Sequence, residues 1–392
     1  MSKSFYFAGW LIDGSGSPAR KDILIEVENG VISSLERANL VDVENRGLDI
    51  EAYPDSTILP GLVDSHVHLS MSGKIDRQLR STQLQNSFEQ NRPLISERIK
   101  KSLDFGIMAL RDAGDACGHV LRYMKLYGSL NVHVKCAGHG WRASGRYGKL
   151  IGRVPENGLS LAESIKAYSN GADHIKIINS GINSLNEFGL ETPPQFSCDE
   201  LKAAFESARA IGCKIMVHAN GRLPVQFAIE AGCDSIEHGF FMGSDNLKRM
   251  ADRQIFWVPT AFTMKAFSVN NPGSPQSQVA DRILDAQLEQ MRMAKDLGVH
   301  VAPGTDAGGF GVRHGEALSK ELKLMTTTGF SIEEAIGCAT AGGAGLLGLD
   351  QELGALRRGM PANFLLVGGP PFDLPDSLEK IKRVFIRGKK II

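Results

Sequence analysis

Two histidines one residue apart, His66 and His68, follow an apolar run in the stretch PGLVDSHVHL at residues 60–69. Side chains at positions i and i+2 of a β-strand point to the same face, so both imidazoles can reach one point. Paired imidazoles are typical ligands of a transition metal. An isolated pair of this kind fits a solvated strand face equally well, so the rest of the chain has to decide.

Further residues of metal-binding type stand on other short apolar segments. His218 ends KIMVH, His238 ends SIEH and Asp306 ends VAPGTD, while Lys176 lies inside HIKIIN. Singly, these residues fit a capped turn, a buried histidine or a snorkelling lysine. Together they suit two divalent ions, Zn²⁺ above all, that share a hydroxide nucleophile. A buried amine among cations is costly, but CO₂ can carboxylate it to a bridging ligand.

Helix-then-strand units repeat from about residue 95 and would position these side chains. An amphipathic helix that ends in glycine is followed at once by a short apolar strand, as in SARAIG and then CKIMVHANG. Glycine suits the left-handed position that closes a helix. Strands that alternate with helices indicate a parallel sheet. The glycines expected at helix ends are Gly106, Gly171, Gly212, Gly232 and Gly298.

Eight candidate strands favour an α/β fold of the (β/α)₈ TIM-like barrel type. An open doubly wound sheet is less well supported, because no GxGxxG motif follows any strand. Active sites of such barrels gather at the carboxyl ends of the strands, where the residues named above fall. The eight segments are ILPGLVDSH, IMALRD, HVKCAG, HIKIIN, KIMVH, SIEH, WVPTA and VAPGTD.

Both ends of the chain read as strand-rich and helix-poor. Residues 1–58 alternate in strand fashion around the turn stretch DGSGSP, and residues 354–392 contain NFLLVGG and IKRVFIRG. We therefore expect the two ends to form one small β-sandwich, with the barrel at residues 59–353 between them.

Composition excludes several classes of partner. The chain has 44 basic and 44 acidic residues and an isoelectric point near 7.1, which gives no electrostatic basis for binding nucleic acid or an anionic membrane. The N-terminus lacks the features of a signal peptide. Six scattered cysteines suit a reducing compartment. We expect a cytoplasmic homo-oligomer that acts on a small molecule.

The combined pattern resembles the amidohydrolase superfamily. Its signature is HxH on strand 1, lysine on strand 4, histidine on strands 5 and 6, and aspartate on strand 8. The stretches LPGLVDSHVHL, IEHG, GTDAG and RRGMPANFLLV carry the resemblance. Within the superfamily the chain is most similar to the binuclear Xaa-Pro dipeptidase (prolidase-like) and imidazolonepropionase-related group. The matching residues are His66, His68, Lys176, His218, His238 and Asp306.

This resemblance implies a metal-dependent hydrolase that cleaves an amide or peptide C–N bond through a hydroxide bridging two metals. His66, His68 and Asp306 would hold the more buried metal, and carboxylated Lys176 would bridge. His218 and His238 would hold the more exposed one. Asp306 would also be the general base, and an Xaa-Pro dipeptide or N-acyl amino acid would be the substrate.

The resemblance also implies residues that contact the substrate. His139, in AGHG, would stabilise the oxyanion together with Asn220, which stands where many prolidase-like members have histidine or tyrosine. Residues on the loops after strands 3 and 8 would grip a carboxylate. The expected substrate contacts are His139, Arg142, Arg146, Tyr147, Asn220, Arg313 and His314.

Three alternatives stay open from the sequence. A lactonase or phosphotriesterase would use the same binuclear core on a different electrophile. A mononuclear deaminase would usually lack Lys176 and carry a glutamate soon after His218, where this chain has ANGRL. A non-catalytic barrel scaffold would have lost one or more of the six ligands.

Overall fold

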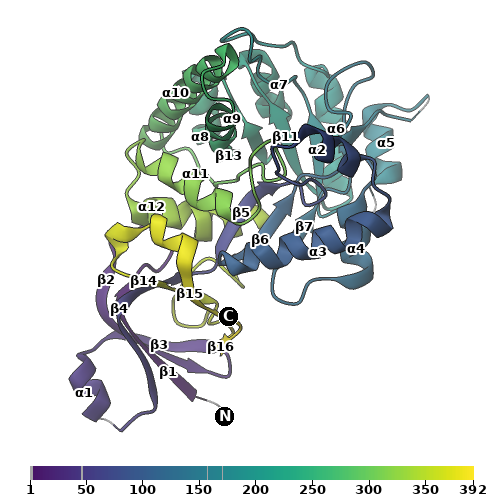
Figure 1. Cartoon of the computed structure of the whole chain (residues 1–392). Helices are drawn as coiled ribbons and strands as arrows, with labels where there is room; N and C mark the ends of the chain where they lie inside the picture. The colour runs from purple at the N-terminus through teal and green to yellow at the C-terminus, as the bar shows by residue number, and fades with distance from the viewer. Residues whose placement is uncertain (1–2, 46, 157, 170) are drawn as a thin grey trace.

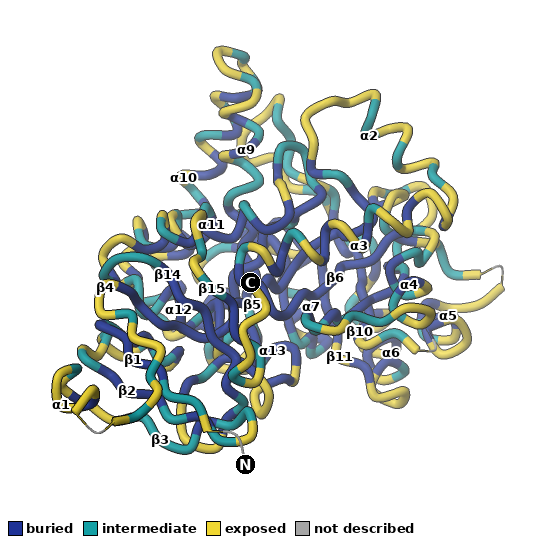
Figure 2. Tube along the Cα trace, turned by 60° about the horizontal axis from the view of Figure 1, so that its bottom comes forward, coloured by how far each residue is buried: buried dark blue, intermediate teal, exposed yellow. Residues whose placement is uncertain are grey.

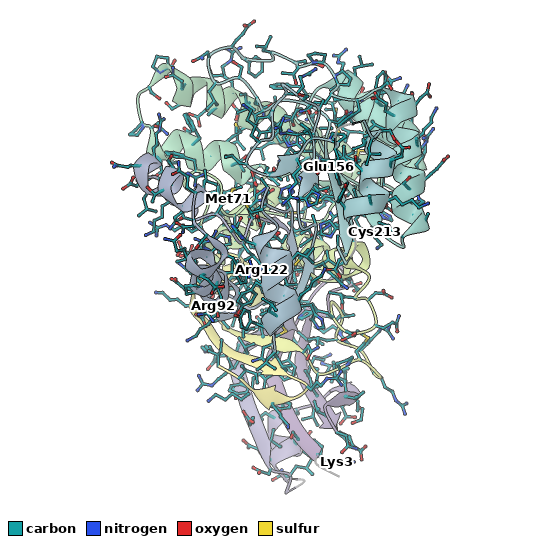
Figure 3. All side chains as sticks on the ribbon, turned by 90° about the vertical axis from the view of Figure 1, so that its right-hand side faces the viewer. Lys3, Met71, Arg92, Arg122, Glu156 and Cys213 are labelled. Carbon is teal, nitrogen blue, oxygen red and sulfur yellow. The ribbon has the colours of Figure 1, made fainter. Side chains whose placement is uncertain are left out.

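The structure is a computed structural model, and it describes residues 3–45, 47–156, 158–169 and 171–392. Two regions follow each other along its long axis (Figure 1). A sheet made by the two ends of the chain lies below a larger region of helices and parallel strands. Lys3 lies at the outer end of this sheet, and Met71 lies in the larger region (Figure 3).

Strands from both termini form one seven-stranded sheet in the order β16-β15-β14-β4-β1-β2-β3. The C-terminal β14 pairs antiparallel with β4, and β4 pairs parallel with β1. Tyr6, Phe364 and Phe385 pack at its centre, with the two phenylalanine rings stacked at 4.5 Å. The predicted joining of the two ends is therefore present, while the sandwich and its boundaries stay predictions. The strands are β1 (Lys3–Leu11), β2 (Arg20–Glu28), β3 (Val31–Arg37), β4 (Ile50–Pro60), β14 (Phe364–Gly368), β15 (Ile381–Ile386) and β16 (Lys389–Lys390).

The larger region contains two parallel sheets, which confirms the α/β class. One sheet has the order β5-β6-β7 and the other β13-β12-β11-β10-β8-β9. Six of the eight predicted strands are present, and the first is divided between two strands. Residues 301–306 form no strand: isolated parallel bridges join Val301 to Trp257 and the following residue, Ala307, to Val67. The strands are β5 (Leu62–Val67), β6 (Ile107–Asp112), β7 (His133–Cys136), β8 (Gly140–Trp141), β9 (Gly152–Arg153), β10 (His174–Ile178), β11 (Lys214–Ala219), β12 (Ser235–His238) and β13 (Phe256–Val258).

The first predicted strand, residues 58–66, is divided between the two regions, so its prediction as one strand is wrong. Residues 58–60 end β4 of the terminal sheet, and β5 begins at Leu62. Gly61 stands at the break, where an added Cβ would lie 2.2 Å from Sδ of Met108. The close approach of the Met108 side chain leaves room for glycine alone at this crossing.

Helices alternate with the parallel strands as predicted. Four of them begin with a serine capping box, for example Ser197 with Glu200 at the start of α6. The five glycines predicted to end helices all have left-handed φ, from 70° to 87°. The helices are α1 (Leu40–Asn45), α2 (Arg77–Leu84), α3 (Phe88–Asp104), α4 (His119–Tyr127), α5 (Leu161–Tyr168), α6 (Cys198–Ala210), α7 (Arg222–Ala231), α8 (Ser244–Asp252), α9 (Phe262–Asn270), α10 (Pro275–Asp296), α11 (Glu316–Thr326), α12 (Ile332–Gly337) and α13 (Gly343–Leu347).

The parallel strands form the interior, and the outer faces of the helices are exposed (Figure 2). Every residue of β5, β6, β10 and β12 is buried. Strands covered on both faces are apolar along their length, so any polar side chain in them needs a partner. Among the described residues, no helix combines the length and apolar character needed to cross a bilayer.

Candidate metal centre

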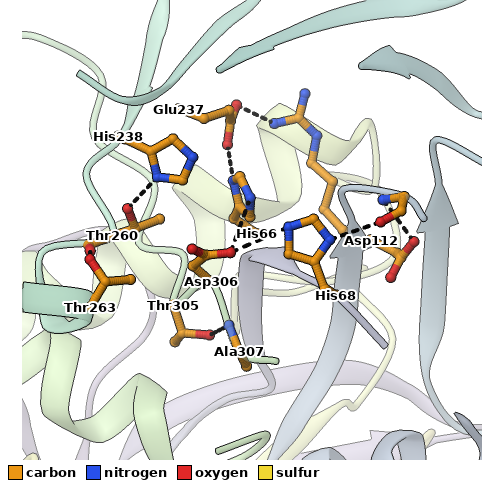
Figure 4. Close-up of polar contacts among 12 residues, drawn as sticks. His66, His68, Asp112, Glu237, His238, Thr260, Thr263, Thr305, Asp306 and Ala307 are labelled. Carbon is orange, nitrogen blue, oxygen red and sulfur yellow. Dashed lines mark hydrogen bonds and ion pairs between the residues drawn. The ribbon is translucent and has the colours of Figure 1, made fainter. Parts of the chain in front are cut away.

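Three predicted ligands, His66, His68 and Asp306, meet at the carboxyl end of β5 (Figure 4). One ligand atom from each lies within 4.8 Å of the others. Nε2 of His68 is 3.3 Å from Oδ1 of Asp306, and Nε2 of His66 is 3.7 Å from the same oxygen. His66 ends up beside His68 because the two are one residue apart on the strand, as their spacing predicts.

His218 and His238 bring two further imidazoles to the same place. Their ring centroids are 4.6 Å apart, and the His238 ring is 4.9 Å from that of His66. Nδ1 of His238 hydrogen-bonds Oγ1 of Thr260 at 2.7 Å, and Nε2 of His218 donates to the carbonyl oxygen of Gly181 at 3.0 Å. Each ring is therefore held by one nitrogen, and its other nitrogen makes no hydrogen bond within the part of the chain that the structure describes, so it can bind an ion.

Glu237 holds the His66 ring by a hydrogen bond to its second nitrogen (Figure 4). Its Oε2 lies 2.7 Å from Nδ1 of His66, and its Oε1 contacts NH1 of Arg111 at 3.1 Å and Oγ of Ser235 at 2.5 Å. The side chains of Glu237 and His66 have no exposed surface. A carboxylate in this position fixes the orientation of a metal-binding imidazole and makes it a better donor.

The backbone is left-handed at two ligands and at a supporting residue. The φ angles are 68° at His238, 58° at Asp306 and 46° at Thr260. The His238 carbonyl oxygen accepts hydrogen bonds from Nε1 of Trp257 at 3.0 Å and Nε2 of Gln287 at 2.6 Å. These bonds hold a conformation that side chains other than glycine rarely adopt, and such conformations gather at functional sites.

The burial and the hydrogen bonding of Lys176 test whether these residues fit a metal. Its side chain is 1% exposed, and its Nζ has no hydrogen-bond partner in the described part of the chain. Nε2 of His66 is likewise buried without a hydrogen bond. Burial lowers the pKa of Lys176 to about 8, although Glu237 and Asp306 oppose the shift. Unpaired buried polar atoms beside a carboxylate indicate a missing ligand, so this set of side chains fits divalent ions.

Protonation also favours metal binding here. Burial and the charge of Lys176 lower the pKa of His218 to about 4, and burial lowers that of His238 well below its ordinary value. Burial alone would raise the pKa of Asp306, but the hydrogen bond to His68 and nearby cations lower it instead. Neutral imidazoles and an ionised carboxylate are the forms that bind metals.

Two predicted substrate contacts, His139 and Tyr147, lie on segments next to these ligands, since Gly140, the residue after His139, pairs with Lys176. Nε2 of His139 is buried without a partner in the described residues, and its ring lies 4.8 Å from that of Trp141. Burial and the charge of Arg153 lower the pKa of His139 to about 4, so the ring is neutral near pH 7. The Tyr147 ring lies 5.5 Å from that of His218.

Arg142 and Arg146 follow β8 as predicted, but both guanidinium groups bind backbone. Arg142 donates to the carbonyl oxygens of Gly152 at 3.2 Å and of Ala143 at 3.1 Å. Arg146 donates to the carbonyl oxygen of Pro193 at 2.7 Å. In this structure both arginines support their loop, and a role in gripping a carboxylate stays a prediction.

Asn220, Arg313 and His314 take different positions. Asn220 is buried, and its Oδ1 accepts from the amide of Phe240 at 3.1 Å. Nε2 of His314 lies 3.2 Å from the backbone oxygen of His68, and the Arg313 side chain is 66% exposed. The structure thus brings Asn220 and His314 against ligand-bearing segments and leaves Arg313 at the surface.

Sequence reasoning missed three residues of the site: Glu237, Thr260 and Arg80. Arg80 lies on α2 and donates to the carbonyl oxygen of Gly308 at 2.9 Å. Burial lowers the pKa of Arg80, and the nearby charge of Asp306 opposes this shift. A signal for Glu237 was present, since it is the one acidic residue in the buried strand SIEH. Arg80 follows no strand, so its position carries no such signal.

A second cluster of metal-binding types, Asp115, Cys117 and His119, lies at the start of α4. The Asp115 carboxylate already accepts hydrogen bonds from the backbone amides of Cys117, His119 and Val120. These bonds satisfy the first turn of the helix, which accounts for the cluster without a metal.

The amidohydrolase family profile matches residues 57–391, which is most of the chain. The chain belongs to the amidohydrolase family, and it is a hydrolase of that type. The predicted resemblance is thereby confirmed.

Individual relatives cover the same length. The chain is 26% identical to an uncharacterised protein of Mycobacterium tuberculosis, over 96% of this chain and 94% of that protein. It is 25% identical to ochratoxinase of Aspergillus niger, over 94% of this chain and 81% of that enzyme. The crystal structure of a Xaa-Pro dipeptidase with bound methionine superposes with a TM-score of 0.82, at 27% identity and 99% coverage of both chains.

Proposed function

We propose that this protein hydrolyses the C–N bond of a small amide, either an N-acyl amino acid or an Xaa-Pro dipeptide. One observation carries the proposal. Lys176 is buried with no hydrogen-bond partner among the described residues, and its charge acts on the predicted ligands around it: His66, His218, His238 and Asp306. A mononuclear deaminase has no use for this lysine, whereas a binuclear hydrolase needs it as a bridge.

Six side chains would hold two divalent ions, with Zn²⁺ the best match to their donors. His66, His68 and Asp306 would bind one ion, and His218 and His238 the other. The amine of Lys176, neutral in part because its pKa is about 8, would add CO₂, lose a proton and bridge the two as a carbamate. The ions would lower the pKa of the attacking water and polarise the substrate carbonyl.

The protein's own groups would then move the protons. Asp306 is ionised and would take a proton from the water that attacks the carbonyl carbon. The same carboxyl group would pass that proton to the amide nitrogen as the C–N bond breaks, which releases a carboxylic acid and an amine. The buried Nε2 of His139 has no acceptor in the described ranges and would donate to the carbonyl oxygen as its charge develops.

Two groups near the centre suit the far end of the substrate. Burial lowers the pKa of Arg80 and the charge of Asp306 opposes this shift, so the two side chains are near each other. Arg80 would pair with a carboxylate of the substrate. Tyr147 lies beside His218 and offers a ring and a hydroxyl. The named activities of the two relatives, Xaa-Pro dipeptidase and ochratoxinase, support a substrate of this kind.

We propose too that the parallel strands close into a (β/α)₈ barrel at residues 59–353, flanked by a sandwich of the two ends. The bridges from Val67 to Ala307 and from Trp257 to Val301 support closure on one side. The hydrogen bond from the Asp173 amide to the Cys136 carbonyl oxygen, at 2.9 Å, supports it between β7 and β10.

The test is a substrate panel on enzyme saturated with Zn²⁺. The panel contains N-acyl amino acids, Xaa-Pro dipeptides, lactones and phosphotriesters, and kcat/KM is measured for each. We expect the highest values among the amides and no turnover after metal removal by a chelator. Higher kcat/KM for a lactone or phosphotriester than for every amide would replace the proposal with that activity.

A further inference from the structure

A cavity of about 680 Å³ lies outside the metal centre, between α3 and α11 and under the loop that follows β5. This volume falls within the range of small-molecule binding sites. None of the six predicted ligands lines it. Ser72, Ile75, Leu94, Arg98, Phe262 and Ala317 are among the residues that do.

Backbone pairing separates this cavity from the metal centre. The amide of Gly73 donates to the carbonyl oxygen of Gly308 at 3.3 Å. The amide of Gly308 donates in turn to the carbonyl oxygen of Val312 at 3.0 Å. The His68 side chain faces Asp306 on one side of this layer. On the other side, the backbone oxygen of His68 is 3.2 Å from Nε2 of the cavity residue His314.

Arg98 is the main polar feature of the cavity wall. Its side chain is only 8% exposed, and NH1 donates to the carbonyl oxygen of Leu69 at 2.6 Å. Within the described ranges, no carboxylate forms an ion pair with it and no other acceptor binds the remaining guanidinium N–H groups. Glu97, which also lines the cavity, acts on the Arg98 charge without forming an ion pair with it. The unpaired N–H groups of Arg98 are not among the fully buried atoms, so they are open to a ligand carboxylate, which could accept from two of them.

Charge and apolar surface of the cavity point to the same kind of ligand. Basic side chains outnumber acidic ones by five to three, and two of the basic ones, Lys101 and Arg313, share a single partner in Glu316. Ile75 is 53% exposed beside the cavity, and Leu94 and Phe262 add further apolar surface. A bound molecule would thus find a cationic end and an apolar wall.

We propose that this cavity is a second binding site, separate from the metal centre, for a small organic carboxylate with an apolar body. The carboxylate pairs with Arg98, and the apolar body covers Ile75, Leu94 and Phe262. The site does not depend on the proposed amide hydrolysis, because none of these residues touches the reacting atoms.

Calorimetric titration of the metal-loaded protein with benzoate tests this proposal, and benzamide serves as the neutral counterpart. We expect benzoate to bind with a Kd of about 1 mM or lower, and benzamide to bind about tenfold more weakly or worse. Ile75→Glu changes an exposed residue, so folding is retained while the charge and the apolar contact at the cavity are altered. Arg98→Met removes the guanidinium itself.

Both variants should weaken benzoate binding about tenfold or more. Leu126→Glu is the matched control, since Leu126 is 59% exposed on α4 and does not line the cavity. It should bind benzoate as the native protein does. Native affinity in Ile75→Glu would place benzoate elsewhere, the metal centre included, and would overturn the proposal. Equal binding of benzamide and benzoate, or no binding of either, would overturn it as well.

Discussion

His218 and Asn220 donate hydrogen bonds to the same acceptor, the carbonyl oxygen of Gly181. Nε2 of His218 lies 3.0 Å from this oxygen, and Nδ2 of Asn220 lies 3.3 Å from it. Oδ1 of Asn220 accepts from the amide of Phe240, two residues after His238. Asn220 therefore ties together the backbone segments that carry and orient both histidines of the more exposed ion.

This arrangement favours a positioning role for Asn220, and the variant Asn220→Ala tests it. We expect occupancy of the more exposed metal position to weaken about tenfold or more, because His218 loses part of its support. The ratio of kcat/KM for two substrates that differ beyond the scissile bond should stay constant. Asn246→Ala is the control, since Asn246 is a buried asparagine bound to the Arg222 and Met242 carbonyls. A changed ratio with full metal occupancy would instead make Asn220 a contact to the part of the substrate beyond the scissile bond.

Glu237→Gln should weaken metal binding about 10–100-fold, because the amide keeps the shape of the carboxylate but not its charge. The charge orients His66 and neutralises the buried Arg111. The measurement is Zn²⁺ affinity by competition with a coloured chelator. Glu321→Gln replaces a different buried carboxyl group, which accepts from the amides of Ala261 and Phe262, and should leave affinity unchanged. Equal affinities in native protein and Glu237→Gln would contradict the role.

Lys176→Ala should lose activity and hold fewer than two ions per chain, because no bridging oxygens remain. A short carboxylic acid such as acetate should restore part of both, since it can enter the space left by the lysine. Lys214→Ala is the control on the neighbouring strand, where Lys214 donates to the carbonyl oxygens of Gly345 and Leu346. Metal content by atomic absorption and kcat are the readouts. Full activity of Lys176→Ala would exclude the bridge.

The ligand residues could be predicted because their signal is local. A parallel strand buried on both faces is apolar, so His66, His218 and His238 stand out at the ends of such strands. The spacing of His66 and His68 also fixes that both face one way. These residues lie close together because the carboxyl ends of parallel strands meet at one edge of the sheet. This rule predicts their proximity without knowledge of individual contacts.

Other features depended on contacts that no local pattern encodes. At the break, Gly61 has no room for a side chain because Met108, 47 positions further along the chain, packs against it. Arg80 reaches the site from α2 through the Gly308 carbonyl, and its surroundings in the sequence are those of an exposed helix. The segment 301–306 pairs too irregularly to form a strand, although its apolar start and its aspartate were read correctly.

Stability should fall as the pH rises from about 5 to about 8. Burial raises the pKa of Glu321 to about 8, although hydrogen bonds from Phe262 and Ala261 oppose the shift. The folded protein thus keeps a proton on Glu321 that the unfolded chain loses above its ordinary pKa of 4.5. Folding is stabilised below that value, and the stabilisation disappears as the pH passes through 8. Asp64 and Asp112, whose pKa burial raises to about 7, act in the same direction.

Thermal midpoints of the native protein and Glu321→Gln at the two pH values check this expectation. The decrease between about pH 5 and pH 8 should be smaller in Glu321→Gln, because its amide does not titrate. Glu206→Gln changes an exposed glutamate on α6 and should show the native decrease. An equal decrease in all three proteins would assign the pH dependence to other groups.

His139→Ala should lower kcat about 10²-fold or more if His139 stabilises the developing oxyanion. The reason is geometric, because its Nε2 is buried, has no acceptor among the described residues, and belongs to a ring packed on Trp141. Its pKa of about 4 keeps the ring neutral, so the loss should be constant from about pH 6 to pH 8. His133→Ala, on the preceding strand β7, removes an imidazole that lies 3.8 Å from Glu352 and should change neither kcat nor KM. Metal content should remain at the native value in both variants, which separates loss of the donor from loss of the ions. A fall in kcat/KM that came entirely from KM would make His139 a ground-state substrate contact, because an oxyanion donor acts on the transition state.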